Sequence, residues 1–218
     1  MDKDSVIILS GGMDSTTLLH YMKDRIALAI SFDYGSNHNA REIECARWQC
    51  EALNIDHLVI PLGFIGKYFK SSLLSGAVEI PKDDYDSDNM KSTVVPFRNG
   101  IMLAVACGMA ESRGLKNVMM ANHGGDHSIY PDCRPEFTKA MGEAMSAGTY
   151  EKIKLIDPFT NISKGDIAKI GNGLGIDFSH TYSCYCGGEL HCGECATCRE
   201  RKQAFLNADV EDPTKYMV

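Results

Sequence analysis

The chain has 218 residues, enough for one full-sized core with a small appendage. Hydrophobic residues make up 44% and charged residues 23%, which is typical of a globular protein, and the formal net charge of −7 argues against nucleic-acid binding as its main task. The first nine residues lack the pattern of a secretion signal, and no run of about 18 apolar residues occurs. We therefore expect a cytoplasmic protein that neither crosses nor binds a membrane.

Short apolar runs alternate with helical patterns along the chain. The runs are continuous rather than alternating, which is typical of strands that are covered on both faces. They predict an α/β fold, Rossmann-like, with a five-stranded parallel sheet sandwiched by helices. The runs are residues 6–9, 26–32, 57–60, 118–121 and 153–156.

Several helices are marked by their spacing or by their ends. Leu18, Leu19 and Met22 predict a helix directly after the first strand. Residues 163–166 (SKGD) have the pattern of a capping box, and glycines at 171, 173 and 175 predict the end of that helix. Residues 75–92, by contrast, are polar and acidic without periodicity, which fits either a solvated loop or a lid over the substrate.

Residues 10–15, SGGMDS, connect the first predicted strand to the first predicted helix. Gly11 and Gly12 allow a ligand to approach the main chain closely, and the free amides at a helix N-terminus suit phosphate. Asp14 would repel that phosphate without a cation between them, which favours magnesium. The pattern differs from the Walker loop and from G-x-G-x-x-G. The sequence thus predicts a phosphate-binding loop of another type.

Five of the nine cysteines lie within residues 184–198. Four of them, in C-x7-C-x2-C-x2-C order, can surround one tetrahedral ion, and a closed four-sulfur site is typical of structural zinc. Cys186 is an alternative to Cys184, and His191 is an alternative to Cys192. An iron–sulfur cluster is an alternative to zinc, because four thiolates suit both.

The SGGMDS loop resembles the pyrophosphate loop of the N-type ATP pyrophosphatases, which cleave ATP between the α and β phosphates and transfer AMP to a substrate oxygen. Together with the cysteine cluster, three stretches resemble the 7-cyano-7-deazaguanine synthase family: FDYGSNH at 32–38, VPFRNG at 95–100 and YPDCRPEF at 130–137. The resemblance extends from the first strand to about Phe205. Ser36 and Asn37 depart from it, because Gln and Arg are commoner there.

This resemblance implies an adenine nucleotide alpha hydrolase-like fold and an ATP-dependent ligase. Such an enzyme converts 7-carboxy-7-deazaguanine and ammonia to 7-cyano-7-deazaguanine through adenylated intermediates, in queuosine biosynthesis. It further implies a homodimer with small-molecule partners and ammonia that is free or supplied by a partner. A tRNA thiolase of the same superfamily and a non-catalytic zinc-bearing RNA-binding module are the alternatives.

The resemblance and the motifs together assign the site. Residues 1–178 are expected to form the nucleotide-binding domain and residues 179–218 the zinc-binding segment. Asp14, Ser15 and Arg98 are the expected catalytic residues, and the functions of His123 and His127 stay open. The residues expected to bind ATP with Mg²⁺ are Leu9, Ser10, Gly11, Gly12, Met13, Asp14, Ser15, Thr16, Thr17, Leu18, Leu19, Asp33 and Tyr34; those expected to bind the substrate are Arg98, Asn99, Asp126, Asp132 and Arg134; and those expected to hold one structural zinc per chain are Cys184, Cys192, Cys195 and Cys198.

Overall fold

The structure is a computed structural model, and it describes residues 3–74, 80 and 88–218. The segment 75–92, expected to be a loop or a lid, falls mostly on residues 75–79 and 81–87, which lie outside the described residues.

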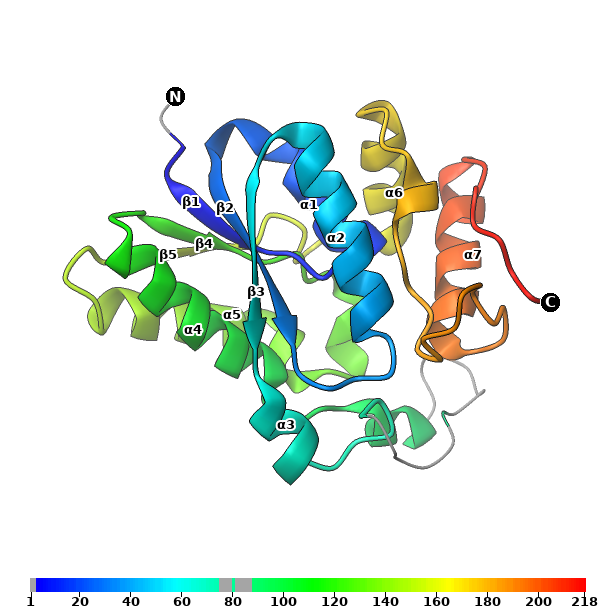
Figure 1. Cartoon of the computed structure of the whole chain (residues 1–218), viewed down its shortest axis with the longest axis horizontal. Helices are drawn as coiled ribbons and strands as arrows, with labels where there is room; N and C mark the ends of the chain where they lie inside the picture. The colour runs from blue at the N-terminus through cyan, green and yellow to red at the C-terminus, as the bar shows by residue number, and fades with distance from the viewer. Residues whose placement is uncertain (1–2, 75–79, 81–87) are drawn as a thin grey trace.

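Five parallel strands form a single sheet in the order β3-β2-β1-β4-β5, which confirms the predicted architecture (Figure 1). Each predicted run lies within two residues of an observed strand. The strands are β1 Ser5–Ile8, β2 Ile26–Asp33, β3 Asp56–Pro61, β4 Asn117–Met119 and β5 Lys154–Ile156.

Helices cover both faces of the sheet. Successive residues of a strand point to opposite faces, so Val6 packs with α3, α4 and α5 while Ile7 packs with α1, α2 and α6. Both side chains are fully buried, which explains why the central strand reads as a continuous apolar run. The helices are α1 Met13–Tyr21, α2 Asn39–Leu53, α3 Gly63–Tyr68, α4 Arg98–Ser112, α5 Pro135–Ala147, α6 Lys164–Gly173 and α7 Ala196–Ala208, with short 3₁₀ helices η1 Lys23–Arg25, η2 Asp88–Thr93, η3 Gly124–Ser128, η4 Pro131–Cys133 and η5 Phe178–His180.

The strand order changes direction beside β1. The chain runs from β1 to β2 and β3 on one side, and then crosses to β4 and β5 on the other. The loops that follow β1 and β4 therefore separate, and open parallel sheets bind their ligands in the crevice that such a reversal leaves.

One segment, Met90–Ser112, has the length and mean hydropathy (1.4) of a membrane-crossing helix, although the sequence contains no uninterrupted apolar run of that length. It contains α4, whose Leu103, Ala106 and Ala110 are fully buried in the core on one face of the sheet. The apolar composition of α4 is thus explained by its packing inside the molecule.

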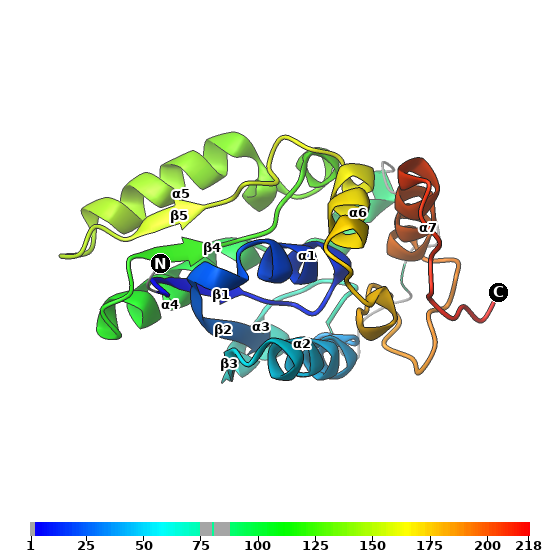
Figure 2. The same ribbon diagram turned by 90° about the horizontal axis from the view of Figure 1, so that it is seen from above.

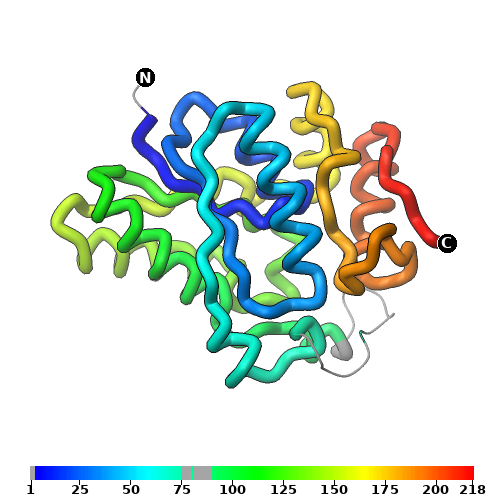
Figure 3. Tube along the Cα trace, in the orientation of Figure 1, coloured from blue at the N-terminus to red at the C-terminus, as the bar shows by residue number. Residues whose placement is uncertain are grey.

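The C-terminal part of the chain lies against α6. Helices α6 and α7 pack side by side in both views (Figures 1 and 2), and the chain passes between them through the cysteine-rich turns before its tail returns along α7 (Figure 3). The capping box at Ser163 and Asp166 is confirmed as the start of α6. On the other side, the ring of Trp48 in α2 stacks on His180 in η5 at 3.8 Å.

Candidate active site and metal centre

The loop between β1 and α1 has the predicted strand, glycine turn and helix. Gly11 has a φ of +91°, and a Cβ at this position would overlap the carbonyl oxygen of Glu42 in α2. Only glycine satisfies both conditions. The Ser10 and Ser15 hydroxyls lie 2.9 Å apart, and the Gly12 amide donates to Ser10 Oγ. Within the described residues no side chain caps α1, which leaves its first amides available to an anion.

A pocket opens at this end of the sheet. It is bounded by the loop after β1, the start of α2, the start of α4 and residues 181–198, which we call the cysteine-rich segment. Predicted site residues that line it are Leu9, Ser10, Gly12, Met13, Asp14, Ser15, Tyr34, Arg98, Asn99 and Asp126; residues not predicted include Ser31, His38, Asn39, Glu42, Asn122, Tyr130, Lys164, Tyr182, Ser183, Tyr185 and Thr197.

Other residues assigned to ATP do not line this pocket. Leu18 and Leu19 are buried in the core behind the loop, and Thr16 is buried with them. The Thr17 hydroxyl donates to the Met13 carbonyl at 2.7 Å within α1. Asp33 is exposed and accepts from the Gly35 amide. Gly11 belongs to the loop without lining the pocket.

Asp132 and Arg134, assigned to the substrate, also lie outside the lining and do not pair with each other. The Asp132 carboxylate accepts from the Asn99 amide at 2.8 Å, in the first turn of α4, and so it fixes the helix that carries Arg98. Arg134 donates to the His127 carbonyl at 2.8 Å. Cys133, which lies between them, is buried at the pocket lining and accepts from Asn99 Nδ2 at 3.2 Å.

Lys164 brings positive charge to the phosphate loop. Its Nζ lies 3.3 Å from Asp14 Oδ2 and 2.6 Å from Glu200 Oε2 in α7. Burial alone would lower the pKa of Lys164, but the two carboxylates raise it, so the ammonium stays charged. His123 lies 3.8 Å from Asp14 and 3.5 Å from Asp126. Sequence reasoning missed Lys164 as a site residue, although it is the second residue of the predicted capping box.

A second polar group lines the opposite wall, along α2. Arg98 Nη1 donates to the Tyr34 hydroxyl at 3.1 Å, which lies 3.3 Å from His38 Nε2. His38 Nε2 is in turn 3.7 Å from Glu42 Oε2. Burial and the Arg98 cation lower the pKa of His38 to about 3, while burial raises the pKa of Glu42 to about 8 although Arg98 opposes it. Asn39 fixes this wall by accepting from the Tyr34 and Ser36 amides.

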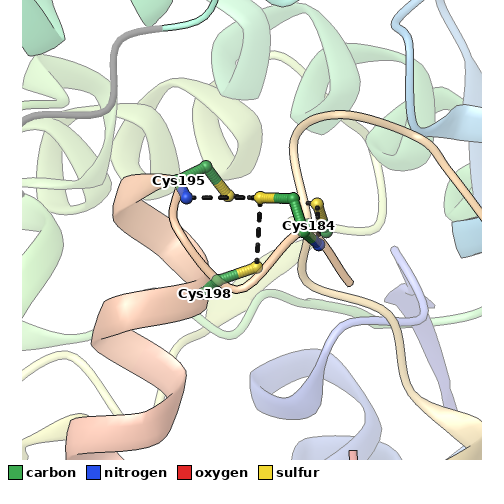
Figure 4. Close-up of side chains that lie close together, drawn as sticks. Cys184, Cys195 and Cys198 are labelled. Carbon is green, nitrogen blue, oxygen red and sulfur yellow. Dashed lines mark hydrogen bonds between the residues drawn. The ribbon is translucent and has the colours of Figure 1, made fainter. Parts of the chain in front are cut away.

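The four predicted cysteines lie together, and Figure 4 shows three of them, Cys184, Cys195 and Cys198. The Sγ atoms of Cys184, Cys192, Cys195 and Cys198 all lie within 4.8 Å of one another, with 3.9 Å between Cys192 and Cys198 and 4.0 Å between Cys195 and Cys184. Zinc–sulfur bonds of about 2.3 Å in a tetrahedron place sulfurs about 3.8 Å apart. The spacing therefore fits a single tetrahedral ion. Cysteine sulfurs around an iron–sulfur cluster would lie farther apart, because the cluster is larger than one ion.

The alternative ligands lie elsewhere. Cys186 is exposed and lies outside the group of four, although its amide donates to Cys184 Sγ at 3.4 Å and its side chain contacts Cys192. His191 Nε2 accepts from the Ser183 amide at 3.0 Å, and its ring packs on Tyr182. The imidazole is thus engaged in holding the chain rather than in the cluster.

The cysteine-rich segment also contacts the phosphate loop directly. The Tyr182 amide donates to the Gly11 carbonyl at 3.0 Å. Behind it, Arg201 is fully buried and donates to Thr181 Oγ1 at 2.9 Å and to the Phe178 carbonyl at 3.1 Å. A metal bound by the cysteines would therefore fix a segment that forms part of the pocket wall.

Comparison with known proteins gives consistent matches. The sequence profile of the queuosine biosynthesis protein QueC matches residues 4–209. A 7-cyano-7-deazaguanine synthase from Porphyromonas gingivalis is 58% identical over 215 residues, covering 99% of this chain and 98% of the relative. Relatives of the same name from Desulfotalea psychrophila and Methanoregula boonei are 54% and 44% identical, covering 99% and 97% of this chain and 99% and 98% of their own.

A solved structure, that of NMN synthetase from Francisella tularensis, matches with a TM-score of 0.52 over 96% of this chain and 79% of that one. At 13% sequence identity this likeness shows the fold alone.

Proposed function

The chain belongs to the family of the queuosine biosynthesis protein QueC, and on that premise we propose that it converts 7-carboxy-7-deazaguanine and ammonia to 7-cyano-7-deazaguanine with ATP. The observation that carries the proposal is the convergence of the SGGMDS loop, Lys164 and Arg98 on one pocket at the reversal point of the sheet.

The chemistry explains this equipment. A carboxylate resists ammonia because it is anionic and its oxide is a poor leaving group. Transfer of AMP to the carboxylate expels pyrophosphate and gives an acyl adenylate, which ammonia converts to the amide with loss of AMP. A second AMP transfer, to the amide oxygen, allows elimination of AMP and formation of the nitrile. In both transfers negative charge develops on phosphate, so fixed donors and cations supply the catalysis.

The residues divide these tasks. The amides after Gly11 and Gly12, with the Ser10 and Ser15 hydroxyls, would hold the departing pyrophosphate, and Asp14 would bind its Mg²⁺. Lys164 would neutralise phosphate charge beside Asp14.

On the opposite wall, Arg98 would clamp a carboxylate or phosphate, with Asn99 and Asp126 beside the substrate. Asp132 and Arg134 would act indirectly, since they fix α4 and η3 rather than line the pocket.

We propose that the four cysteines hold one structural zinc, because their sulfurs fit a closed tetrahedral site. Zinc would then order residues 179–218 against the nucleotide-binding residues 1–178. Metal analysis should give one zinc per chain in a colourless protein, and a brown protein that contains iron would overturn this assignment. The family resemblance supports a cytoplasmic homodimer, which sedimentation velocity tests.

The activity is tested by incubating the protein with ATP, ammonium and 7-carboxy-7-deazaguanine. Mass spectrometry should detect the nitrile together with AMP and pyrophosphate. A protein that forms no nitrile but adds sulfur to tRNA would instead be a thiolase, and the proposal would be wrong.

A further inference from the structure

If the proposed function holds, the nitrogen of ammonia must lose three protons before it becomes the nitrile nitrogen. Ammonia brings three N–H bonds and the nitrile has none. One proton leaves as the C–N bond forms and AMP departs, one as the amide oxygen takes up the second AMP, and one as the C–O bond to AMP breaks to give the nitrile. Water is a poor proton acceptor in an enclosed site. A side chain whose pKa lies near neutral pH is therefore required to take up these protons.

Glu42 is placed for this task. It stands in the first turn of α2, where its backbone packs against Gly11 of the phosphate loop, and it lines the same pocket as Ser10 and Arg98. Its side chain is only 16% exposed. A carboxyl group in such a position lies beside the reacting end of a substrate held between the loop and Arg98.

Titratable and charged groups from several elements surround Glu42. On its own helix, His38 Nε2 lies 3.7 Å from Glu42 Oε2. The hydroxyl of Tyr34, the residue after β2, lies 3.3 Å from His38 Nε2, and Arg98 Nη1 at the start of α4 donates to that hydroxyl at 3.1 Å. From the cysteine-rich segment, the ring of Tyr185 lies 5.6 Å from that of His38. Of these groups Arg98 is the cation, and its guanidinium is hydrogen-bonded to Tyr34 rather than in an ion pair with Glu42.

The other carboxylates of the pocket are less suited. Asp14 is held by Lys164 at 3.3 Å and lies where a phosphate-bound cation is expected. Asp126 lies 3.5 Å from His123 on the side of β4. Both carboxylates thus lie on the side of the phosphate loop and β4, whereas Glu42 stands on the opposite wall of the pocket, along α2.

We propose that Glu42 is the base that accepts the protons of the nitrogen. In amide formation the nitrogen lone pair forms the C–N bond, the C–O bond to AMP breaks, and a nitrogen proton passes to Glu42 Oε. Glu42 returns this proton to solvent through the pocket mouth before the next transfer. The raised pKa of Glu42, about 8 because of burial, suits a group that takes up and releases protons near neutral pH.

The test separates the nucleophile step from adenylation. Glu42→Gln keeps the size of the side chain and resembles the protonated acid, so the fold should persist. Exchange of labelled pyrophosphate into ATP, with carboxylate substrate and without ammonia, should stay within about twofold of wild type, while nitrile formation falls by about 10²- to 10⁴-fold. Glu44→Gln is the matched control, since Glu44 lies on the same helix, is 65% exposed and pairs with Arg41; it should behave as wild type.

A second nucleophile and the pH profile distinguish a base from a merely structural residue. Hydroxylamine is a weaker base than ammonia and is largely neutral near pH 7, so Glu42→Gln should lose less of hydroxamate formation than of amide formation. In wild type and in Glu44→Gln the hydroxamate rate should rise as Glu42 deprotonates near pH 8, and this rise should disappear in Glu42→Gln.

Equal loss with both nucleophiles, loss of pyrophosphate exchange, or full nitrile formation by Glu42→Gln would each overturn the assignment. Wild-type protein that fails in pyrophosphate exchange would instead overturn the proposed function.

Discussion

The phosphate loop and the cysteine-rich segment lie in contact, yet different forces hold them. The loop is fixed between a buried strand and a helix, and its conformation depends on the packing of Gly11 against α2. Residues 181–195 contain neither strand nor helix, and hydrogen bonds from the amides of Cys186 and Cys192 to Cys184 Sγ are among their main local contacts. A hydrophobic core can hold the first region, whereas a metal bound by the four cysteines would hold the second.

A short segment without a core of its own can therefore form part of the pocket wall if a metal holds it. A structural zinc contributes about 10 to 16 kcal/mol in small peptides, comparable with the ~5 to 15 kcal/mol of a whole domain. Through Tyr182, which donates to the Gly11 carbonyl, a zinc bound by the cysteines would stabilise the loop as well.

The largest effect is expected from Cys195→Ser, which should break the segment and leave the sheet folded. Loss of one thiolate from a closed site releases the zinc, so residues 181–212 should become sensitive to protease and nitrile formation should be lost. Limited proteolysis with metal analysis checks this outcome. Cys186→Ser, outside the group of four, should keep both zinc and activity. A zinc-free Cys195→Ser that resists protease would show that packing alone holds the segment.

Lys164→Met comes next, because it removes the cation shared by the loop and the segment. Asp14 and Glu200 would then lose their shared cation in a partly buried site. The loss should lower the free energy of unfolding by about 3 to 5 kcal/mol. Urea denaturation measures this loss. Lys169→Met, exposed on the same helix, should change stability by less than about 0.5 kcal/mol. Equal effects of the two substitutions would contradict the inferred coupling.

Asp14→Ala should act on chemistry rather than on the fold. The ion pair between Lys164 and Glu200 at 2.6 Å survives this change, so the melting temperature should hardly move. Loss of the Mg²⁺ ligand should lower pyrophosphate release by about 10²- to 10³-fold, the usual cost of removing one electrostatic contact in a transition state. A pyrophosphate assay measures it, and retained turnover would refute the role given to Asp14.

The smallest effect is expected from Ser163→Ala at the start of α6. The Ser163 hydroxyl accepts from the Asp166 amide at 3.1 Å, and loss of such a cap costs about 1 kcal/mol. Because the next residue is Lys164, the Michaelis constant for ATP should rise slightly as well. Ser163→Asp, which retains an acceptor, should restore both values; if it does not, the cap does not position Lys164.

The sequence was sufficient for the features that are local. SGGMDS and the cysteine spacing each place their polar groups within one turn or loop, and the structure confirms the strand-to-helix loop and the four-sulfur cluster. The strands were recognisable because buried parallel strands are continuously apolar.

What the sequence concealed depends on contacts between distant segments. Lys164, Glu200 and Asp14 come from three helices, and only folding brings them together. Glu42 left a weak signal, because it stands one turn before the buried Ala46 on the inner face of α2. Asp132 and Arg134 have the residue types of a substrate site, but their partners are Asn99 and the His127 carbonyl, which no motif reveals.

The stacked rings of Trp48 and His180 join α2 to the beginning of the cysteine-rich segment. Trp48 is the single tryptophan of the chain, so the tryptophan emission has one source, which lies at the contact between α2 and η5. Separation of the two rings would change the surroundings of the indole and therefore its emission. Tryptophan emission can therefore report, without any label, whether this contact persists when the metal proposed for the four cysteines is removed.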